Sequence, residues 1–170
     1  MLWIKTFFGI LFQTILLGIF LYLPALTLNW SDAFLLLTIH FLMTILASAY
    51  LLIVKPESIE ARMNYDSKTQ PKEDRLATTL MFSAIIVGLS LAPIDIFHLN
   101  LSSSFEGSIK NIGLAIYIIG MLLFMASINA NEFAETTVNI QEERGQKVID
   151  TGIYSIVRHP MYTGFIFFIT

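Results

Sequence analysis

The chain has 170 residues, of which 55% are hydrophobic and 14% charged, with a net charge of −3 and no cysteine. An apolar fraction above the range of soluble domains, gathered in long blocks, indicates a polytopic membrane protein. The acidic balance and the lack of a basic tract argue against a nucleic-acid partner, and the absence of cysteine excludes disulfides, thiolate metal sites and a cysteine nucleophile. No metal site is predicted.

The first two apolar segments are long enough to cross a bilayer, which requires about 20 residues. Residues 7–26 are interpreted as a retained helix, because the start of the chain lacks the basic region and the cleavage site of a signal peptide. Ser31 or Asp32 can cap the second span, residues 33–54. That span carries His40 near its middle. We expect the imidazole to be hydrogen-bonded within the helix bundle, with a ligand role as the alternative.

A polar loop of mixed charge separates the second span from the third. It covers residues 55–75 and reads KPESIEARMNYDSKTQPKEDR. We expect a solvated connector, and the functional alternative is a buried ion pair between Glu57 and Arg62 that braces the bundle. Residues 77–94 form the third span.

The next features in the chain are interpreted as structural. Asp95 and His98, just beyond the third span, are expected to cap and hydrate that helix end at the interface. Residues 109–130 form the fourth span, in which Gly113 and Gly120 stand at heptad spacing. Small residues in this arrangement permit a close contact with another helix.

The C-terminal region contains too little apolar sequence for another full span. Residues 131–149 are compatible with a half-buried interfacial helix, although the run 136–140 is β-prone. The 11 residues 160–170 rise only about 16 Å as a helix, roughly half of the hydrocarbon core. We therefore expect a chain that is truncated or whose end loops back.

The predicted fold is an all-α membrane protein, a polytopic transmembrane helix bundle of four full spans plus the start of a fifth. Residues 1–130 form the predicted four-helix transmembrane region. Residues 131–170 form a cytoplasmic juxtamembrane segment with a ligand-binding signature and the truncated fifth helix.

The distribution of Lys and Arg predicts the orientation. Nine of the ten basic residues fall on one side, which the positive-inside rule makes cytoplasmic. These nine are Lys5, Lys55, Arg62, Lys68, Lys72, Arg75, Arg144, Lys147 and Arg158, and the exception is Lys110.

The densest polar passage between two apolar segments is QEERGQKVIDTGIYSIVRHPMYTG. Pro160 suits the first turn of a helix, so that Arg158 and His159 lie at a helix mouth that favours an anion. Tyr162 follows His159 by three residues on the same face, and Gly164 allows a close approach to the backbone. Taken singly, these residues are equally typical of a snorkelling cation, a helix start and an aromatic belt. Together they suit a small ligand with a carboxylate and a flat ring.

The stretch V-I-D-T-G-I-Y-S-I-V-R-H-P-M-Y-T-G resembles the signature of the isoprenylcysteine carboxyl methyltransferase-like membrane methyltransferases, roughly (L/V)-V-x-x-G-x-Y-x-x-x-R-H-P-x-Y-x-G. A weaker match is K-P-E-x-x-x-x-R at residues 55–62, which resembles the P-E-x-x-x-x-R after the second span of bacterial members. Gln146 departs from the family, because many members have His there. The family's C-terminal portion has no counterpart, and its catalytic Glu and Arg are expected beyond Thr170.

The resemblance implies an integral membrane methyltransferase that uses S-adenosylmethionine. The acceptor would be lipid-like or a small amphipathic molecule: an isoprenylcysteine carboxylate, a phospholipid amine or a thiol. In this interpretation the helix mouth receives the cofactor's carboxylate, a tyrosine faces the sulfonium and the apolar pair before Gly152 supports the adenine. The implied cofactor-binding residues are Gln146, Val148, Ile149, Gly152, Tyr154, Arg158, His159, Pro160, Tyr162 and Gly164.

Two alternatives stay open. A membrane sterol-type reductase that binds NADPH also carries R-H-P-x-Y-x-G, but Met161 and Phe165 replace the Asn and Glu of that group. A non-catalytic, truncated membrane protein is the other. The expected partners are the lipid bilayer and the methyl acceptor, and the expected location is a bacterial inner membrane with the N-terminus and the signature in the cytoplasm.

Overall fold

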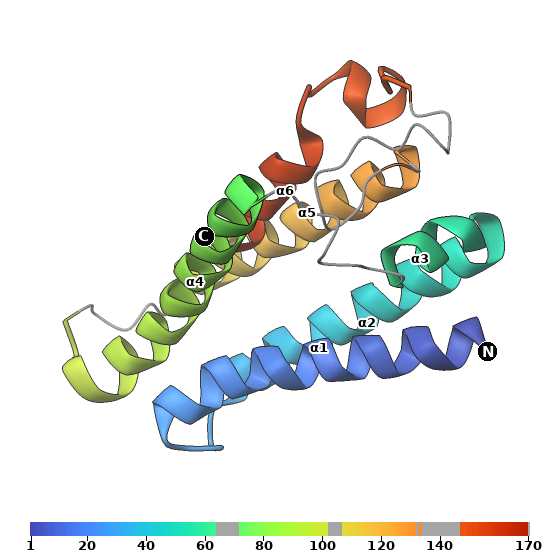
Figure 1. Ribbon diagram of the computed structural model, residues 1–170. Helices are drawn as coiled ribbons and strands as arrows, with labels where there is room; N and C mark the ends of the chain where they lie inside the picture. The colour runs from blue at the N-terminus through green and yellow to red at the C-terminus, as the bar shows by residue number, and fades with distance from the viewer. Residues whose placement is uncertain (64–71, 102–106, 132, 134–146, 170) are drawn as a thin grey trace.

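The computed structural model describes residues 1–63, 72–101, 107–131, 133 and 147–169 (Figure 1). Every regular element within these residues is helical, which confirms the all-α prediction. In chain order they are α1 (Leu2–Ala25), α2 (Ser31–Val54), α3 (Pro56–Met63), α4 (Lys72–Ile94), the π-helical turn η1 (Asp95–Leu99), α5 (Ser108–Ala130), the 3-10 turn η3 (Gly152–Ser155) and α6 (Pro160–Ile169).

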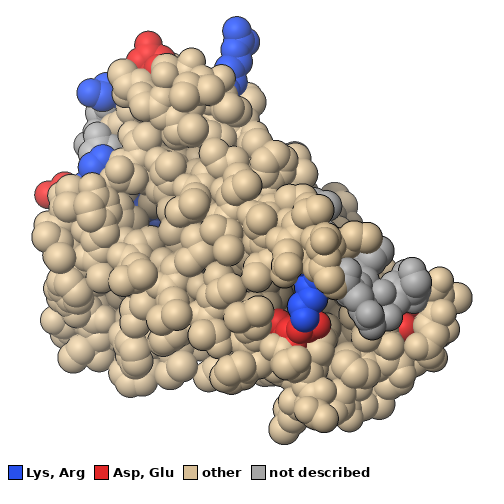
Figure 2. All heavy atoms as spheres, turned by 180° about the vertical axis from the view of Figure 1, so that it is seen from behind, with Lys and Arg blue, Asp and Glu red and all other residues tan. Residues whose placement is uncertain are grey.

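Within the described residues, four helices are long and apolar enough to cross a membrane, as predicted. They are Leu2–Ala25, Ser31–Val54, Arg75–Leu99 and Ser108–Ala130. Between 6% and 22% of each apolar window is buried inside the protein, so most of its side chains face outward. In Figure 2, charged side chains gather toward the ends of the visible face, and most of the surface between them carries none. Such a surface requires a hydrocarbon solvent, and the chain is therefore an integral membrane protein.

The helices form two closely packed groups. In Figure 1, α1 and α2 lie side by side, and α5 and α6 form a second pair; α1 also packs along α4. At the end of the bundle where α2 gives way to α3, Leu51 and Leu52 of α2 pack with Ile59 of α3, and Leu2 and Ile128 complete the cluster. This cluster joins α1, α2, α3 and α5 at one end of the bundle.

The predicted loop 55–75 contains a helix that was not expected. The short helix α3 begins at Pro56, and proline is well suited to the first helical turn. Ser58 and Ile59 are buried, whereas Glu57 is exposed, so Glu57 is not the buried carboxylate that the ion-pair alternative required. Arg62 instead donates from one Nη to the carbonyl (3.0 Å) and hydroxyl (2.5 Å) of Ser58. Residues 64–71 of the predicted loop lie outside the described residues.

The opposite end of the bundle is closed by capping contacts. Asp95 accepts a hydrogen bond from the backbone N–H of Leu101 at 2.8 Å, and His98 bonds the carbonyl of Pro24 at 2.8 Å. The capping interpretation is confirmed for Asp95, whereas His98 bonds the end of α1 and not that of its own helix. The predicted side-chain cap of α2 is wrong, because no side chain caps that helix and Asp32 pairs with Lys110 of α5.

Helices α2 and α5 run parallel and are joined by three polar contacts, one at each end and one in the middle. Lys110 pairs with Asp32 at the start of both helices, and Lys55 Nζ donates to the carbonyl of Asn129 at 2.6 Å at their other ends. Between them, His40 Nδ1 lies 2.7 Å from the hydroxyl of Tyr117. The expectation that His40 is bonded within the bundle is confirmed.

Candidate functional site at the start of helix α6

The turn that precedes α6 is held against the end of α5. Gly152 has a φ of +60°, a conformation that side chains disfavour, and a Cβ at this position would lie 3.7 Å from the Cβ of Ala130. Ser155 Oγ donates to the carbonyl of Gly152 at 2.7 Å and closes the 3-10 turn. Tyr154 is thereby placed beside α5, and its hydroxyl lies 3.5 Å from the amide nitrogen of Asn131.

Helix α6 begins at Pro160, as the sequence predicts, and Pro160 is fully buried. The carbonyl of His159 accepts the first intrahelical bond from the backbone N–H of Thr163 at 3.0 Å, and the Thr163 hydroxyl donates to the same oxygen at 3.1 Å. The N–H groups of Met161 and Tyr162 belong to this first turn, where no intrahelical carbonyl can satisfy them. They add to the positive end of the helix dipole, which favours an anion.

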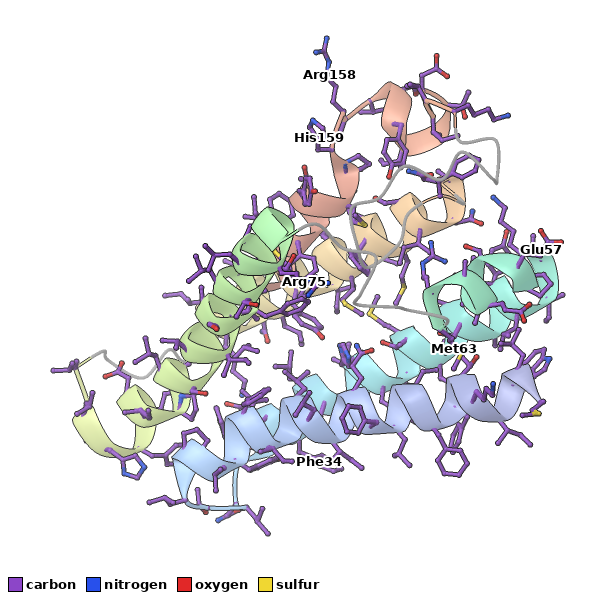
Figure 3. The ribbon with its side chains drawn as sticks, in the orientation of Figure 1. Phe34, Glu57, Met63, Arg75, Arg158 and His159 are labelled. Carbon is purple, nitrogen blue, oxygen red and sulfur yellow. The ribbon has the colours of Figure 1, made fainter. Side chains whose placement is uncertain are left out.

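The basic and aromatic side chains at this helix mouth are accessible. The rings of His159 and Tyr162 lie 5.9 Å apart between centroids, at an interplanar angle of 37°. Both residues are exposed, Tyr162 by 56%. Arg158 is also exposed, and its side chain extends away from the ribbon in Figure 3. The predicted group of Arg158, His159 and Tyr162 therefore forms an open corner at one end of the bundle.

The described residues expected to support an adenine are largely exposed and do not form an enclosed pocket. Val148 is 92% exposed and Ile149 is half-buried, in a stretch without helix. Gln146 lies outside the described residues, as does most of the predicted interfacial helix or strand at 131–149. Among the described residues, Tyr154 lies beside the end of α5, four residues before Arg158 in the chain.

Gly164 has a different environment from the one the sequence suggested. It is buried against α5, where a Cβ would lie 2.8 Å from the carbonyl oxygen of Gly120 and 2.8 Å from the backbone nitrogen of Phe124. The close approach that this glycine permits is therefore made by a neighbouring helix. Gly120 meets the close-contact prediction made for the fourth span, whereas a Cβ on Gly113 would meet nothing within 4 Å.

Sequence reasoning missed Asn131 as a neighbour of the site. Its side chain reaches the Tyr154 hydroxyl, and its Oδ1 accepts a hydrogen bond from the backbone N–H of Phe133 at 3.0 Å. The available signal was its position: an amide side chain directly after an apolar span, at the end of the bundle that also carries the signature.

The region from α5 to α6 matches a known protein family. A family model described as phospholipid methyltransferase matches residues 109–170, from the start of α5 through α6. The matched residues include the start of α6, so the site lies in the region that is similar to this methyltransferase family.

One characterised relative makes the resemblance more specific. The chain is 37% identical over 59 residues to protein-S-isoprenylcysteine O-methyltransferase B of Arabidopsis thaliana, which is 34% of this chain and 30% of that protein. Less than a third of that relative's length thus has a counterpart here. No solved structure matches. Together the two matches confirm the resemblance to the isoprenylcysteine carboxyl methyltransferase-like family, and the family model covers the region that carries the site.

Proposed function

We propose that this chain is a membrane methyltransferase that takes its methyl group from S-adenosylmethionine and transfers it to a lipid-like or small amphipathic acceptor. The observation that carries the proposal is the open corner at the start of α6, where an anion-favouring helix mouth lies beside exposed histidine and tyrosine rings. The family match over residues 109–170 supports it, because that region contains the whole corner.

The residues present fit the charges of this cofactor. Its carboxylate suits the N–H groups at the start of α6, with His159 and Arg158 as neighbouring donors. Its sulfonium suits the face of a tyrosine, a cation–π contact that contributes about 0.5–2 kcal/mol. Ile149, Val148 and the backbone at Gly152 are the proposed support for the adenine, and Asn131 holds the Tyr154 hydroxyl. When bound, the cofactor supplies an activated methyl group.

The acceptor proposal follows from the surroundings of the corner. The spanning helices expose large apolar side chains, such as Leu46 at 68% and Leu122 at 55%, so a hydrophobic acceptor can diffuse in the bilayer beside the site. The basic asymmetry of the sequence supports a site on the cytoplasmic side of the membrane, and we propose a bacterial inner membrane as its location. In this proposal residues 1–130 form the membrane frame and residues 131–170 add the cofactor-binding segment.

Calorimetry with S-adenosylhomocysteine, the product of the cofactor, tests the proposal on the chain purified in detergent. We expect His159→Ala and Tyr162→Ala each to weaken binding by roughly ten-fold, the equivalent of about 1.4 kcal/mol. Tyr50→Ala is the matched control, because Tyr50 is 51% exposed on α2 and Tyr162 is 56% exposed on α6. Unchanged dissociation constants in both variants, or binding of NADPH in place of S-adenosylhomocysteine, would contradict the proposal; the latter result favours a reductase.

A further inference from the structure

Two glycines allow a close backbone approach at the α5–α6 interface. A Cβ built on Gly120 would lie 2.6 Å from the backbone nitrogen of Phe168 and 2.8 Å from the carbonyl oxygen of Gly164. A Cβ built on Gly164 would lie 2.8 Å from the carbonyl oxygen of Gly120. Gly120 and Gly164 therefore face each other, one from each helix.

These contacts cannot be relieved by a side-chain rotation, because most of the opposing atoms belong to the backbone. Ordinary contact with a Cβ begins at 3.4 Å, so a methyl group on either glycine forces one helix to move away from the other. Packed interiors resist such insertions. Helix α6 thus has one seating on α5 that only glycine at both positions allows.

The rest of α6 is fixed at its far end by aromatic packing. The ring of Phe168 packs edge-on against Tyr117 at 6.3 Å and against Phe124 at 5.9 Å. Tyr117 in turn is hydrogen-bonded to His40 of α2. A methyl group on Gly164 therefore acts near the start of α6, where Tyr162 and His159 lie two and five residues away. A methyl group on Gly120 also meets the backbone nitrogen of Phe168, so it displaces α6 at both ends and moves the same two side chains.

We propose that Gly120 and Gly164 are positioning residues of the cofactor site. They set the place of the His159–Tyr162 corner relative to Tyr154, which is seated on the same helix α5 through Gly152 and Asn131. In this role Gly164 acts through its contact with α5 and does not touch the ligand. Gly120 lies outside the signature, but its substitution should weaken ligand binding as much as substitution of Gly164. The identity of the ligand in this inference rests on the proposed function, whereas the contact between the two helices does not.

A cross-linking measurement tests the helix contact without any ligand. Because the chain has no cysteine, Ser127→Cys and Met161→Cys give a clean pair. Because residue 120 lies beside 164 and residue 124 beside 165, we expect the antiparallel pairing to bring residues 127 and 161 together. Ser127 and Pro160 are both fully buried. We expect Gly120→Ala and Gly164→Ala each to slow disulfide formation in membranes. Gly113→Ala, on the same helix with nothing within 4 Å, should not.

The same variants, with and without the cysteine pair, are then titrated with S-adenosylhomocysteine. Both Gly120→Ala and Gly164→Ala should weaken binding by about ten-fold or more, as overpacking of a tight contact implies. Closing the 127–161 disulfide should recover part of that loss, because it returns the first turn of α6 to α5. A variant that folds poorly without the cross-link can be titrated in its disulfide-bonded form.

The outcomes separate the two proposals. Equal cross-linking in all variants overturns the inference, whatever the ligand does. Slower cross-linking with unchanged affinity overturns the positioning role. Weaker binding in Gly164→Ala alone, without rescue, means that Gly164 touches the ligand directly and also overturns it. If the unmodified chain binds no S-adenosylhomocysteine, the proposed function fails, and the positioning role for that ligand is overturned with it, while the cross-linking result still decides whether the glycines seat α6.

Discussion

Replacing Tyr117 by phenylalanine removes a single hydroxyl from the middle of the membrane bundle. In the intact protein, Gln13 Nε2 of α1 lies 3.1 Å from His40 Nε2 of α2, and His40 Nδ1 lies 2.7 Å from the Tyr117 hydroxyl of α5. Because an amide nitrogen only donates, the ring accepts at Nε2 and donates its Nδ1 proton to the tyrosine oxygen. The substitution leaves that donor without a partner.

The expected cost follows from the burial of the pair. His40 is 6% exposed and Tyr117 is 9% exposed, so no water replaces the lost hydroxyl. A buried group left unsatisfied costs about 1–3 kcal/mol, whereas hydrogen bonds between membrane helices average about 0.6 kcal/mol. We expect Tyr117→Phe to lower the free energy of unfolding by about 1–2 kcal/mol. His40→Leu leaves both Gln13 and Tyr117 without their partner and should lower the free energy of unfolding further.

The decisive comparison is the triple variant Gln13→Leu, His40→Leu and Tyr117→Phe. Replacing all partners by apolar groups leaves no orphan, so this variant should lose less stability than His40→Leu alone. Reversible unfolding in mixed micelles of a mild detergent and dodecyl sulfate, followed by circular dichroism, measures each value. Tyr50→Phe, at an exposed site on α2, is the control and should stay within about 0.5 kcal/mol of the unmodified chain. Additive losses in the triple variant would refute the reasoning.

Two further predictions concern the ends of the bundle. An impermeant maleimide applied to intact cells should label a cysteine at Leu101 and spare one at Glu60, because the basic residues predict that α3 is cytoplasmic; the reverse pattern would overturn the proposed side of the cofactor site. Lys55→Met, which removes the donor to the Asn129 carbonyl, should lower stability by about 1–2 kcal/mol, whereas Lys5→Met at an exposed position should have little effect. Equal losses in the two lysine variants would show that the Lys55 contact adds nothing.

The elements of this protein that sequence predicts well are those governed by local composition. An apolar run of about 20 residues has few structural options in a bilayer, so the four spans and their order follow from the sequence. Proline at the first turn predicts the start of α6 at Pro160, because its ring and missing N–H suit that position alone in a helix. The accessible group of Arg158, His159 and Tyr162 follows from their spacing around that helix start.

The elements that sequence misjudges depend on contacts between distant segments. The loop after α2 contains the helix α3, which is stabilised by burial of Ser58 and Ile59 against other helices rather than by its own apolar pattern. The carboxylate of Asp32 pairs with Lys110 of α5 and does not cap the start of its own helix. Sequence gives the capping option, but only the approach of α5 determines which partner Asp32 takes.

The sequence by itself therefore determines that this is an all-α membrane protein, where its spanning helices lie and that a helix begins at Pro160. It can do so because hydropathy and backbone stereochemistry act over a few residues. Only the tertiary structure determines what surrounds them. Gly164 lies in the signature, but the atoms that fill its open side belong to Gly120 and Phe124. His40 lies alone in an apolar span, but Gln13 and Tyr117 satisfy it from two other helices. These partners are 27 to 77 residues away along the chain, and it is packing, not local pattern, that brings them together.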